Sequence, residues 1–367
     1  MMTADHEIDS LAAFDAHLAA GLRLDRCVVQ SVDLTERSEQ LKRTPVEAAI
    51  FLGCLMRPGI DDSLRDRGAL VFPRLPELPF NPYRPRMYET PDLFDAVLTG
   101  GDYADCHDAR IYAWHRAQGI QPSLGATLSM SLHDHSMSES LDDWCASRPP
   151  QTTIGIMGGH AAARGTETFR QAARLAGALT RGGRLVMTGG GPGAMEASNL
   201  GAYLAGEPEA LDDAIEVLAA AADFHANLTA WAHAMVEVRR RWQPSGESAG
   251  IPTWFYGHEP PNGFATVIPK YFSNAIREDT LLQRCRGGIV YLQGAAGTVQ
   301  EIFQAATGNY YTPLGSPTTP MVLVGREYWT HKLPAWPLLE ALGRDRQMGT
   351  RLHLVDHVEE AAEVLLG

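Results

Sequence analysis

Two glycine-rich segments contain the residues of this chain best suited to hold a phosphate. Residues 188–195 read Thr-Gly-Gly-Gly-Pro-Gly-Ala-Met, and residues 293–298 read Gln-Gly-Ala-Ala-Gly-Thr. Each segment follows a short apolar run and precedes a helical pattern, so backbone N–H groups at the positive end of a helix can approach an anion. Glycine-rich turns between a strand and a helix also occur for steric reasons alone, and neither segment has the GxGxxG spacing. The residues by themselves leave both interpretations open.

Charged side chains near these segments are candidates for chemistry. Glu301 follows Thr298 at the spacing of a capping box, so it is either a helix cap or a carboxylate of the site. Arg277 precedes the second segment, and a guanidinium pairs well with phosphate and carboxylate oxygens, although an ordinary surface position also fits. Glu259 begins a Glu-Pro-Pro-Asn stretch, and His160 ends a Gly-Gly-His turn.

Strands and helices alternate regularly in the part of the chain that holds these residues. We expect strands at 153–157, 184–187, 253–256, 288–292 and 321–324. We expect helices at 169–179, 194–204, 211–222, 227–240, 279–284, 297–306 and 358–366. The alternation predicts an α/β fold, a Rossmann-like doubly wound parallel sheet with helices on both faces. Right-handed crossovers bring the carboxyl ends of all the strands to one edge, where such sheets bind ligands.

The first 150 residues have a different character. Apolar runs at 48–55 and 69–72 and helical patterns at 88–98 and 138–144 predict a smaller α+β N-terminal region, in which we find neither a repeat nor a chemical motif. Pro149 and Pro150 mark the expected break. The predicted domains are therefore 1–150, of unknown role, and 151–367, a nucleotide-binding domain.

Composition excludes several classes of protein. The 31 Lys and Arg against 44 Asp and Glu give a net charge of -13, which argues against a nucleic-acid partner. The five cysteines are scattered without a CxxC pair, and His133 and His135 lack a third ligand, so we expect no metal site. The N-terminus lacks the pattern of a signal peptide and no apolar run approaches 18 residues, so we expect a cytoplasmic protein with no membrane segment.

Four motifs in order resemble the LOG ("lonely guy") family, whose members were long labelled lysine decarboxylases. They are the Gly-Gly-His turn at 158–160, the glycine-rich segment continued to 197, the Glu-Pro-Pro-Asn stretch at 259–262, and Gly-Ala-Ala-Gly-Thr-Val-Gln-Glu at 294–301. The resemblance covers roughly residues 151–330. It is greatest to the long bacterial members, the pyrimidine/purine nucleotide 5'-monophosphate nucleosidases.

The resemblance implies hydrolysis of the N-glycosidic bond of a nucleoside 5'-monophosphate, without a metal or redox cofactor, by a homodimer or higher homo-oligomer. Glu301 would be the catalytic carboxylate and Arg277 the site arginine, with Arg284 as its rival. Residues expected to bind substrate or phosphate are Gly158, Gly159, His160, Gly189, Gly190, Gly191, Gly193, Met195, Glu196, Glu259, Asn262, Gly294, Ala295, Ala296, Gly297 and Thr298. The preferred base stays open.

Two positions depart from the family hallmark Pro-Gly-Gly-x-Gly-Thr-x-x-Glu. Gln293 stands for the proline, and Ala295 stands for the second glycine. The Cβ of Ala295 leaves the loop able to hold phosphate only if φ at that residue is negative. A nucleotide-binding or regulatory protein without hydrolytic activity is therefore the alternative hypothesis.

Overall fold

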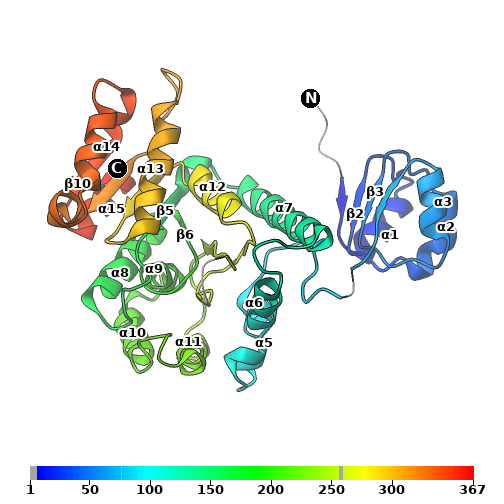
Figure 1. Cartoon of the computed structure of the whole chain (residues 1–367), viewed down its shortest axis with the longest axis horizontal. Helices are drawn as coiled ribbons and strands as arrows, with labels where there is room; N and C mark the ends of the chain where they lie inside the picture. Colours follow the sequence, from blue (N-terminus) through cyan, green and yellow to red (C-terminus); the bar gives the residue numbers. More distant parts are fainter. Residues whose placement is uncertain (1–5, 76, 256–258) are drawn as a thin grey trace. The chain divides into compact units, whose positions relative to one another are not determined.

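The structure is a computed structural model that describes residues 6–75, 77–255 and 259–367 (Figure 1). The chain forms two compact units, one of residues up to 86 together with 122–140, the other of 87–121 together with 141–367. The division differs from the expected single boundary at residue 150, because residues 87–121 are anchored in the second unit. There Asp108 accepts hydrogen bonds from Lys270 Nζ at 2.7 Å and from Trp254 Nε1 at 2.9 Å, and all three side chains are buried.

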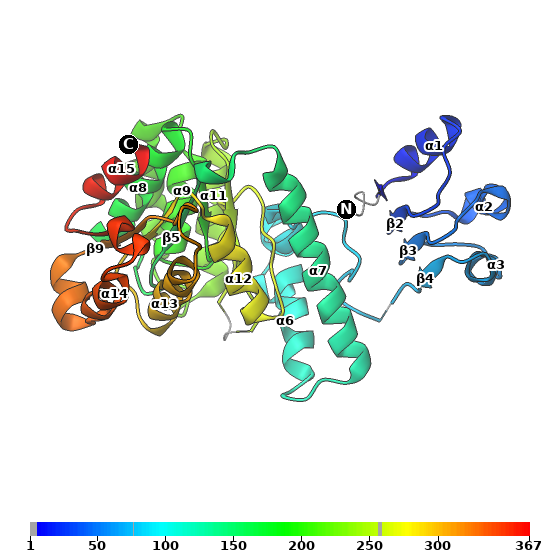
Figure 2. The ribbon, with the colours of Figure 1, turned by 90° about the horizontal axis from the view of Figure 1, so that it is seen from above.

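The first unit is built on a parallel sheet of four short strands in the order β1-β2-β3-β4. Its elements are β1 (Glu7–Ile8), α1 (Leu11–Ala19), β2 (Val28–Gln30), α2 (Ser38–Arg43), β3 (Ile50–Leu52), α3 (Ile60–Asp66) and β4 (Leu70–Phe72). The strands pair with Ile8, Val29, Phe51 and Val71 in register, and this row packs against the three helices, which lie on one face (Figure 2).

A strand followed by a helix thus recurs three times before β4 closes the sheet of the first unit. The sequence predicted an α+β arrangement for this region, and the structure differs in that respect. The strands are all parallel, so this unit is also α/β. Two of the four strands, β1 and β2, are only two and three residues long, which is too short for a period-2 pattern to stand out.

The second unit contains a six-stranded parallel sheet in the order β10-β9-β8-β5-β6-β7. Its strands are β5 (Thr153–Met157), β6 (Leu185–Thr188), β7 (Ser248–Gly250), β8 (Gly288–Tyr291), β9 (Met321–Val324) and β10 (Leu352–Val355). Counted along the chain, this is the doubly wound Rossmann order, with the switch between β5 and β8. The predicted fold class of this part is confirmed.

Helices cover both faces of this sheet. The helices of the second unit are α4 (Thr90–Leu93), α5 (Asp95–Leu98), α6 (His107–Ala117), α8 (Glu167–Arg181), α9 (Ala194–Tyr203), α10 (Leu211–Ala219), α11 (Leu228–Arg241), α12 (Asn274–Arg284), α13 (Ala296–Tyr310), α14 (Ala335–Gly343) and α15 (Val358–Leu366). The remaining helix, α7 (Leu124–Ala146), contributes residues to both units. On one face α8 packs against α9 and α15, and on the other α13 packs against α12 and α14 (Figure 2).

One predicted strand is displaced in the structure, and one strand of the sheet was not predicted. The expected strand at 253–256 is replaced by β7 at Ser248–Gly250, and of that stretch Thr253 makes only an isolated bridge to Tyr271. Pro252 intervenes and has no N–H to give to a ladder. Residue 256 lies outside the described residues. The edge strand β10 was not predicted, since its first three residues are only partly buried and carry a histidine.

No helix in the described ranges is both long enough and apolar enough to cross a membrane.

Candidate functional site

The predicted segments meet at the switch point of the Rossmann-like sheet. β5 and β8 are neighbours, with Met157 paired to Tyr291 at their carboxyl ends. Just beyond them the Gly159 N–H donates to the Gln293 carbonyl at 3.1 Å, which ties the Gly-Gly-His turn to the second glycine-rich segment. Ligands of open α/β sheets bind in the crevice at this point, because the connections leave β5 and β8 toward opposite faces.

A cavity of about 690 Å³ opens at this edge. It is lined by these residues that the sequence singled out: Gly158, Gly159, His160, Gly189, Gly191, Met195, Glu259, Arg277, Gly294, Ala295, Ala296, Gly297, Thr298 and Glu301. Its volume suits a ligand of the size of a nucleotide. Gly190, Gly193, Glu196 and Asn262, which were also predicted, do not line this cavity.

The loop before α13 has the geometry of an anion-binding helix start. Ala295 is the N-cap residue, and its φ is -111°. This negative φ is the condition under which an alanine in place of glycine leaves the loop able to hold phosphate. In the part of the chain that the structure describes, no side chain caps this end, and the first N–H groups of the helix have no intrahelical partner. These N–H groups, with the Thr298 hydroxyl, are available to hold a phosphate.

Gly294 keeps this loop tight. A Cβ built on it would lie 2.1 Å from Thr298 Oγ1, so only glycine fits without displacing that side chain. Tyr328 OH donates to the Gly294 carbonyl at 2.6 Å and fixes it from the other side. Gly297 differs, since an added Cβ there meets nothing within 4 Å.

Glu301 belongs to the cavity and not to a helix cap. α13 begins at Ala296, so Ala295 takes the N-cap position and Thr298 does not, which removes the capping-box interpretation. Glu301 lies in the second turn, is buried, and faces Arg277, whose Nη1 is 3.8 Å from Glu301 Oε1. Burial, and next the charge of Glu278, raise the pKa of Glu301 to about 8, against the opposing effect of Arg277.

The choice between the two candidate arginines follows from their contacts. Arg277 lines the cavity and its guanidinium lies between Glu278 and Glu301. Arg284, two turns later on α12, pairs with Asp142 at 2.6 Å and donates to the Thr280 carbonyl, and it does not line the cavity. Arg277 is therefore the arginine of the site.

The turn after β6 is held by a buried polar network. The Gly190 N–H donates to Thr188 Oγ1, and Thr188 Oγ1 donates to Asn199 Oδ1. Asn262 Nδ2 donates to Asn199 Oδ1 at 3.0 Å and to the Gly191 carbonyl at 3.1 Å. Gly190 has φ +72°, which favours glycine. Gly190 and Asn262 thus support the turn and do not line the larger cavity, and their role in contacting substrate stays a prediction.

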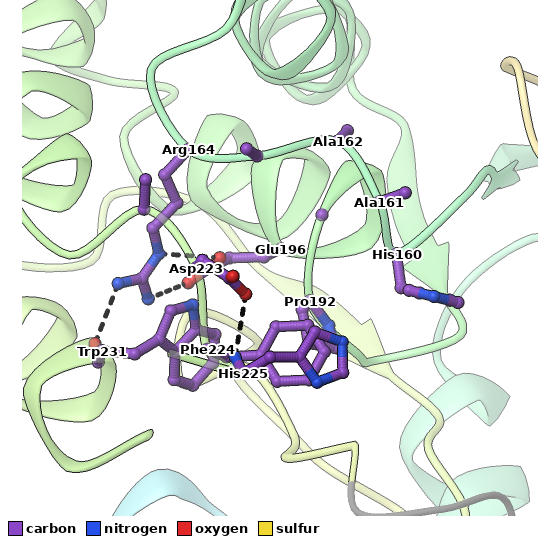
Figure 3. Close-up of a pocket in the computed structure, with 13 residues that line it drawn as sticks. His160, Ala161, Ala162, Arg164, Pro192, Glu196, Asp223, Phe224, His225 and Trp231 are labelled. Atoms are coloured by element: carbon purple, nitrogen blue, oxygen red, sulfur yellow. Dashed lines mark hydrogen bonds and ion pairs between the residues drawn. The ribbon is translucent and has the colours of Figure 1, made fainter. Parts of the chain in front are cut away.

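Glu196 is also a structural residue and not a substrate contact. It is fully buried in the first turn of α9 and forms a bidentate ion pair with Arg164, at 2.5 and 3.0 Å. Arg164 also donates to the Trp231 carbonyl and stacks on the Trp231 ring, as Figure 3 shows. Glu196 does not line the larger cavity and Arg164 holds both of its carboxylate oxygens, so these contacts do not support its predicted role as a substrate contact.

This ion pair lines a second, smaller cavity of about 330 Å³ (Figure 3). Gly193, whose φ is +72°, lies on its wall, and a Cβ there would approach the carbonyl oxygens of Gly159 and His160 at 2.6 Å. Glycine is needed at this position because the two loops pack closely, and the expected contact of Gly193 with substrate stays a prediction. His160 borders both cavities.

Two polar side chains face the larger cavity from opposite loops. His160 Nδ1 lies 3.5 Å from Glu259 Oε1, and both side chains are partly exposed. Glu278 and Tyr328 line the cavity too, and the sequence did not single them out for it. Glu278 directly follows Arg277 on α12, and Tyr328 comes from a segment beyond β9 that carries no motif.

His133, the first residue of the rejected metal motif, is buried in α7 in the first unit, with its ring edge-on to Phe80. No group of three or more potential metal ligands occurs within the described ranges.

Comparison with known proteins adds a likeness of fold. No family model matches the sequence, and no curated protein matches it. The molybdenum cofactor binding protein from the phototrophic bacterium Rippkaea orientalis is similar at 16% identity over 58% of this chain and 93% of its own, with a TM-score of 0.37. The Moco carrier protein from Chlamydomonas reinhardtii is similar at 17% identity over 58% of this chain and 96% of its own, with a TM-score of 0.36. Identities and TM-scores this low carry no information about function.

The buried Glu301 makes stability depend on pH. Its pKa is about 8 in the folded protein against an ordinary value of 4.5, so the unfolded chain loses this proton first as the pH rises. This residue therefore lowers the free energy of unfolding by about 1.4 kcal/mol per pH unit between those two values. We expect Glu301→Gln to be more stable than the parent protein at pH 8 and similar to it at pH 4.5. Urea denaturation at both pH values measures this, and an equal difference at the two would contradict it.

Proposed function

We propose that this protein is a nucleoside 5'-monophosphate N-glycosidase of the LOG type, which releases the free base and ribose 5-phosphate. One observation carries the proposal: an open helix start suited to phosphate and a buried arginine with a buried carboxyl group line the same cavity. The loop 294–298 provides the first, and Arg277 with Glu301 provides the second. In a nucleotide the phosphate and the glycosidic bond are about one sugar apart. A bound nucleotide would place its phosphate at the loop and its glycosidic bond beside the carboxyl group.

The chemistry fits these groups. The bond between C1' and the base nitrogen breaks, water adds its oxygen to C1', and a proton passes to the leaving base. Positive charge develops on the ribose in the transition state, as in glycoside hydrolysis, and a carboxyl group beside it assists the reaction. Glu301 is the group that we place there. Arg277 orients Glu301 and balances the charge of the phosphate.

The test is to incubate the purified protein with a panel of purine and pyrimidine nucleoside 5'-monophosphates. Chromatography for the free base and a coupled assay for ribose 5-phosphate would detect the reaction. Release of both products in equal amounts supports the proposal. Tight binding of a monophosphate without release of any base would instead support a nucleotide-binding or regulatory protein.

The phosphate loop and the helix after it give a matched pair of variants. We expect Gly294→Ala to weaken binding of nucleoside monophosphate at least about tenfold, because the new Cβ displaces Thr298 from the helix start, and the loss of one charge-assisted hydrogen bond is already worth that factor. Gly308→Ala, at an exposed position of the helix that follows the loop and outside the cavity, has room for its Cβ and serves as the control, with affinity unchanged within about twofold. Isothermal titration calorimetry compares the two. Equal affinities would place the phosphate elsewhere.

A further inference from the structure

Two carboxyl groups share one guanidinium in the wall of the larger cavity. Arg277 Nη1 lies 3.2 Å from Glu278 Oε2 and 3.8 Å from Glu301 Oε1. The two carboxyl oxygens are therefore no farther apart than the sum of these distances. All three side chains are nearly inaccessible, and all three line the cavity. The arrangement therefore has two carboxyl groups and one cation.

Within the described residues, Arg277 is the cation in contact with this pair of carboxyl groups. Asp279 on α12, Tyr291 on β8 and Cys285 after α12 are the other titratable groups that interact with the pair, and none of them is cationic. Across the cavity lie Glu259 and His160. Two buried carboxylates beside a single arginine cannot both ionise freely, so the pair retains one proton near neutral pH.

Geometry indicates which member carries the proton. Arg277 is nearer to Glu278 than to Glu301, and this favours an ionised Glu278. Within the described residues Glu278 Oε2 accepts no hydrogen bond, although the side chain is only 2% exposed. That oxygen faces Arg277 Nη1, and Glu278 is among the residues that line the cavity. Burial raises the pKa of both carboxyl groups, but Arg277 and a hydrogen bond with Asn274 oppose the rise at Glu278, whereas the charge of Glu278 adds to the rise at Glu301. Glu301 is therefore the protonated member.

We propose that Glu278 is a second catalytic residue, the base that takes a proton from the attacking water while Glu301 gives its proton to the leaving base. The inference rests on the proposed function and divides the reaction between two carboxyl groups. The C1'–N bond breaks as the Glu301 proton reaches the base, and the water oxygen bonds to C1' as its proton reaches Glu278. Transfer of that proton to Glu301 through water then restores the starting state.

The variant Glu278→Gln tests the proposal through the pH dependence of kcat/KM for a monophosphate that the parent protein hydrolyses. The parent protein should show a bell-shaped profile, because one carboxyl group must be ionised and the other protonated. We expect Glu278→Gln to lower kcat by about 10²- to 10⁴-fold and to lose the acidic limb. Its alkaline limb should also move to lower pH, since the charge of Glu278 no longer raises the pKa of Glu301.

Controls separate the possible failures. Asp279→Asn changes the neighbouring carboxylate, which accepts a hydrogen bond from Gln304 outside the cavity, and should keep kcat within about twofold and keep both limbs. If Glu278→Gln fails to fold by circular dichroism, Glu278→Asp, which retains a carboxyl group, should still show both limbs. An active parent protein with an unchanged profile in Glu278→Gln would overturn this inference alone. A parent protein that releases no base would overturn the proposed function and this role with it.

Discussion

Glu301→Gln is expected to lower kcat for base release by about 10²- to 10⁴-fold, the range for loss of a positioned acid or base. Glutamine fills the same space in the second turn of α13, but it can neither ionise nor give up a carboxyl proton. Binding should survive, because we propose that the phosphate is held by backbone N–H groups of the loop before Glu301. The substitution therefore separates catalysis from affinity.

The measurement needs kcat and the dissociation constant from the same preparations. Glu363→Gln makes the same chemical change on the exposed side of α15 and should leave both quantities within about twofold of the parent protein. A Glu301→Gln variant that keeps the parental kcat would exclude this residue from the reaction. A variant that loses affinity and keeps its turnover at saturation would make Glu301 a binding residue instead.

The location of the site could be predicted from the sequence because it depends on chain order. Strands that alternate with helices place every strand end at one edge, so motifs that follow strands meet without knowledge of any side-chain contact. Residues 158–160 and 293–298 meet there because β5 and β8 are neighbours. The choice of Arg277 over Arg284 required the structure, since both lie on α12 two turns apart on nearly the same face, and only Arg277 lines the cavity.

Roles that depend on packing could not be predicted. Glu196 and Asn262 lie within motifs that contact the cavity, yet each is satisfied by a buried partner that is distant in sequence, Arg164 and Asn199 respectively. Glu278 is the opposite case, because it belongs to no motif and yet lines the cavity. It does so because α12 turns that face toward the cavity, which the sequence does not reveal. The first unit was misjudged for a local reason, since its strands are too short to show periodicity.

The ion pair between Arg164 and Glu196 offers the largest effect on stability. Both side chains are at most 1% exposed. We expect Glu196→Gln to lower the free energy of unfolding by about 3–5 kcal/mol, because it leaves the charge of Arg164 buried without its partner. Glu216→Ala breaks an exposed ion pair with Arg170 and should cost no more than about 1 kcal/mol. Chemical denaturation of the three proteins at pH 7 gives the comparison.

The same variant decides whether Glu196 supports the fold or contacts the ligand. Glu196 lies outside the larger cavity and Arg164 holds both of its oxygens, so the folded fraction of Glu196→Gln should bind nucleoside monophosphate with parental affinity. Replacing both partners, as in Arg164→Met with Glu196→Leu, should recover part of the loss, since no buried charge then remains. Recovery should be incomplete, because Arg164 also donates to the carbonyls of Ala221 and Trp231, which would lose their donor. Unchanged stability with weakened binding in Glu196→Gln would reverse the assignment and return Glu196 to the ligand site.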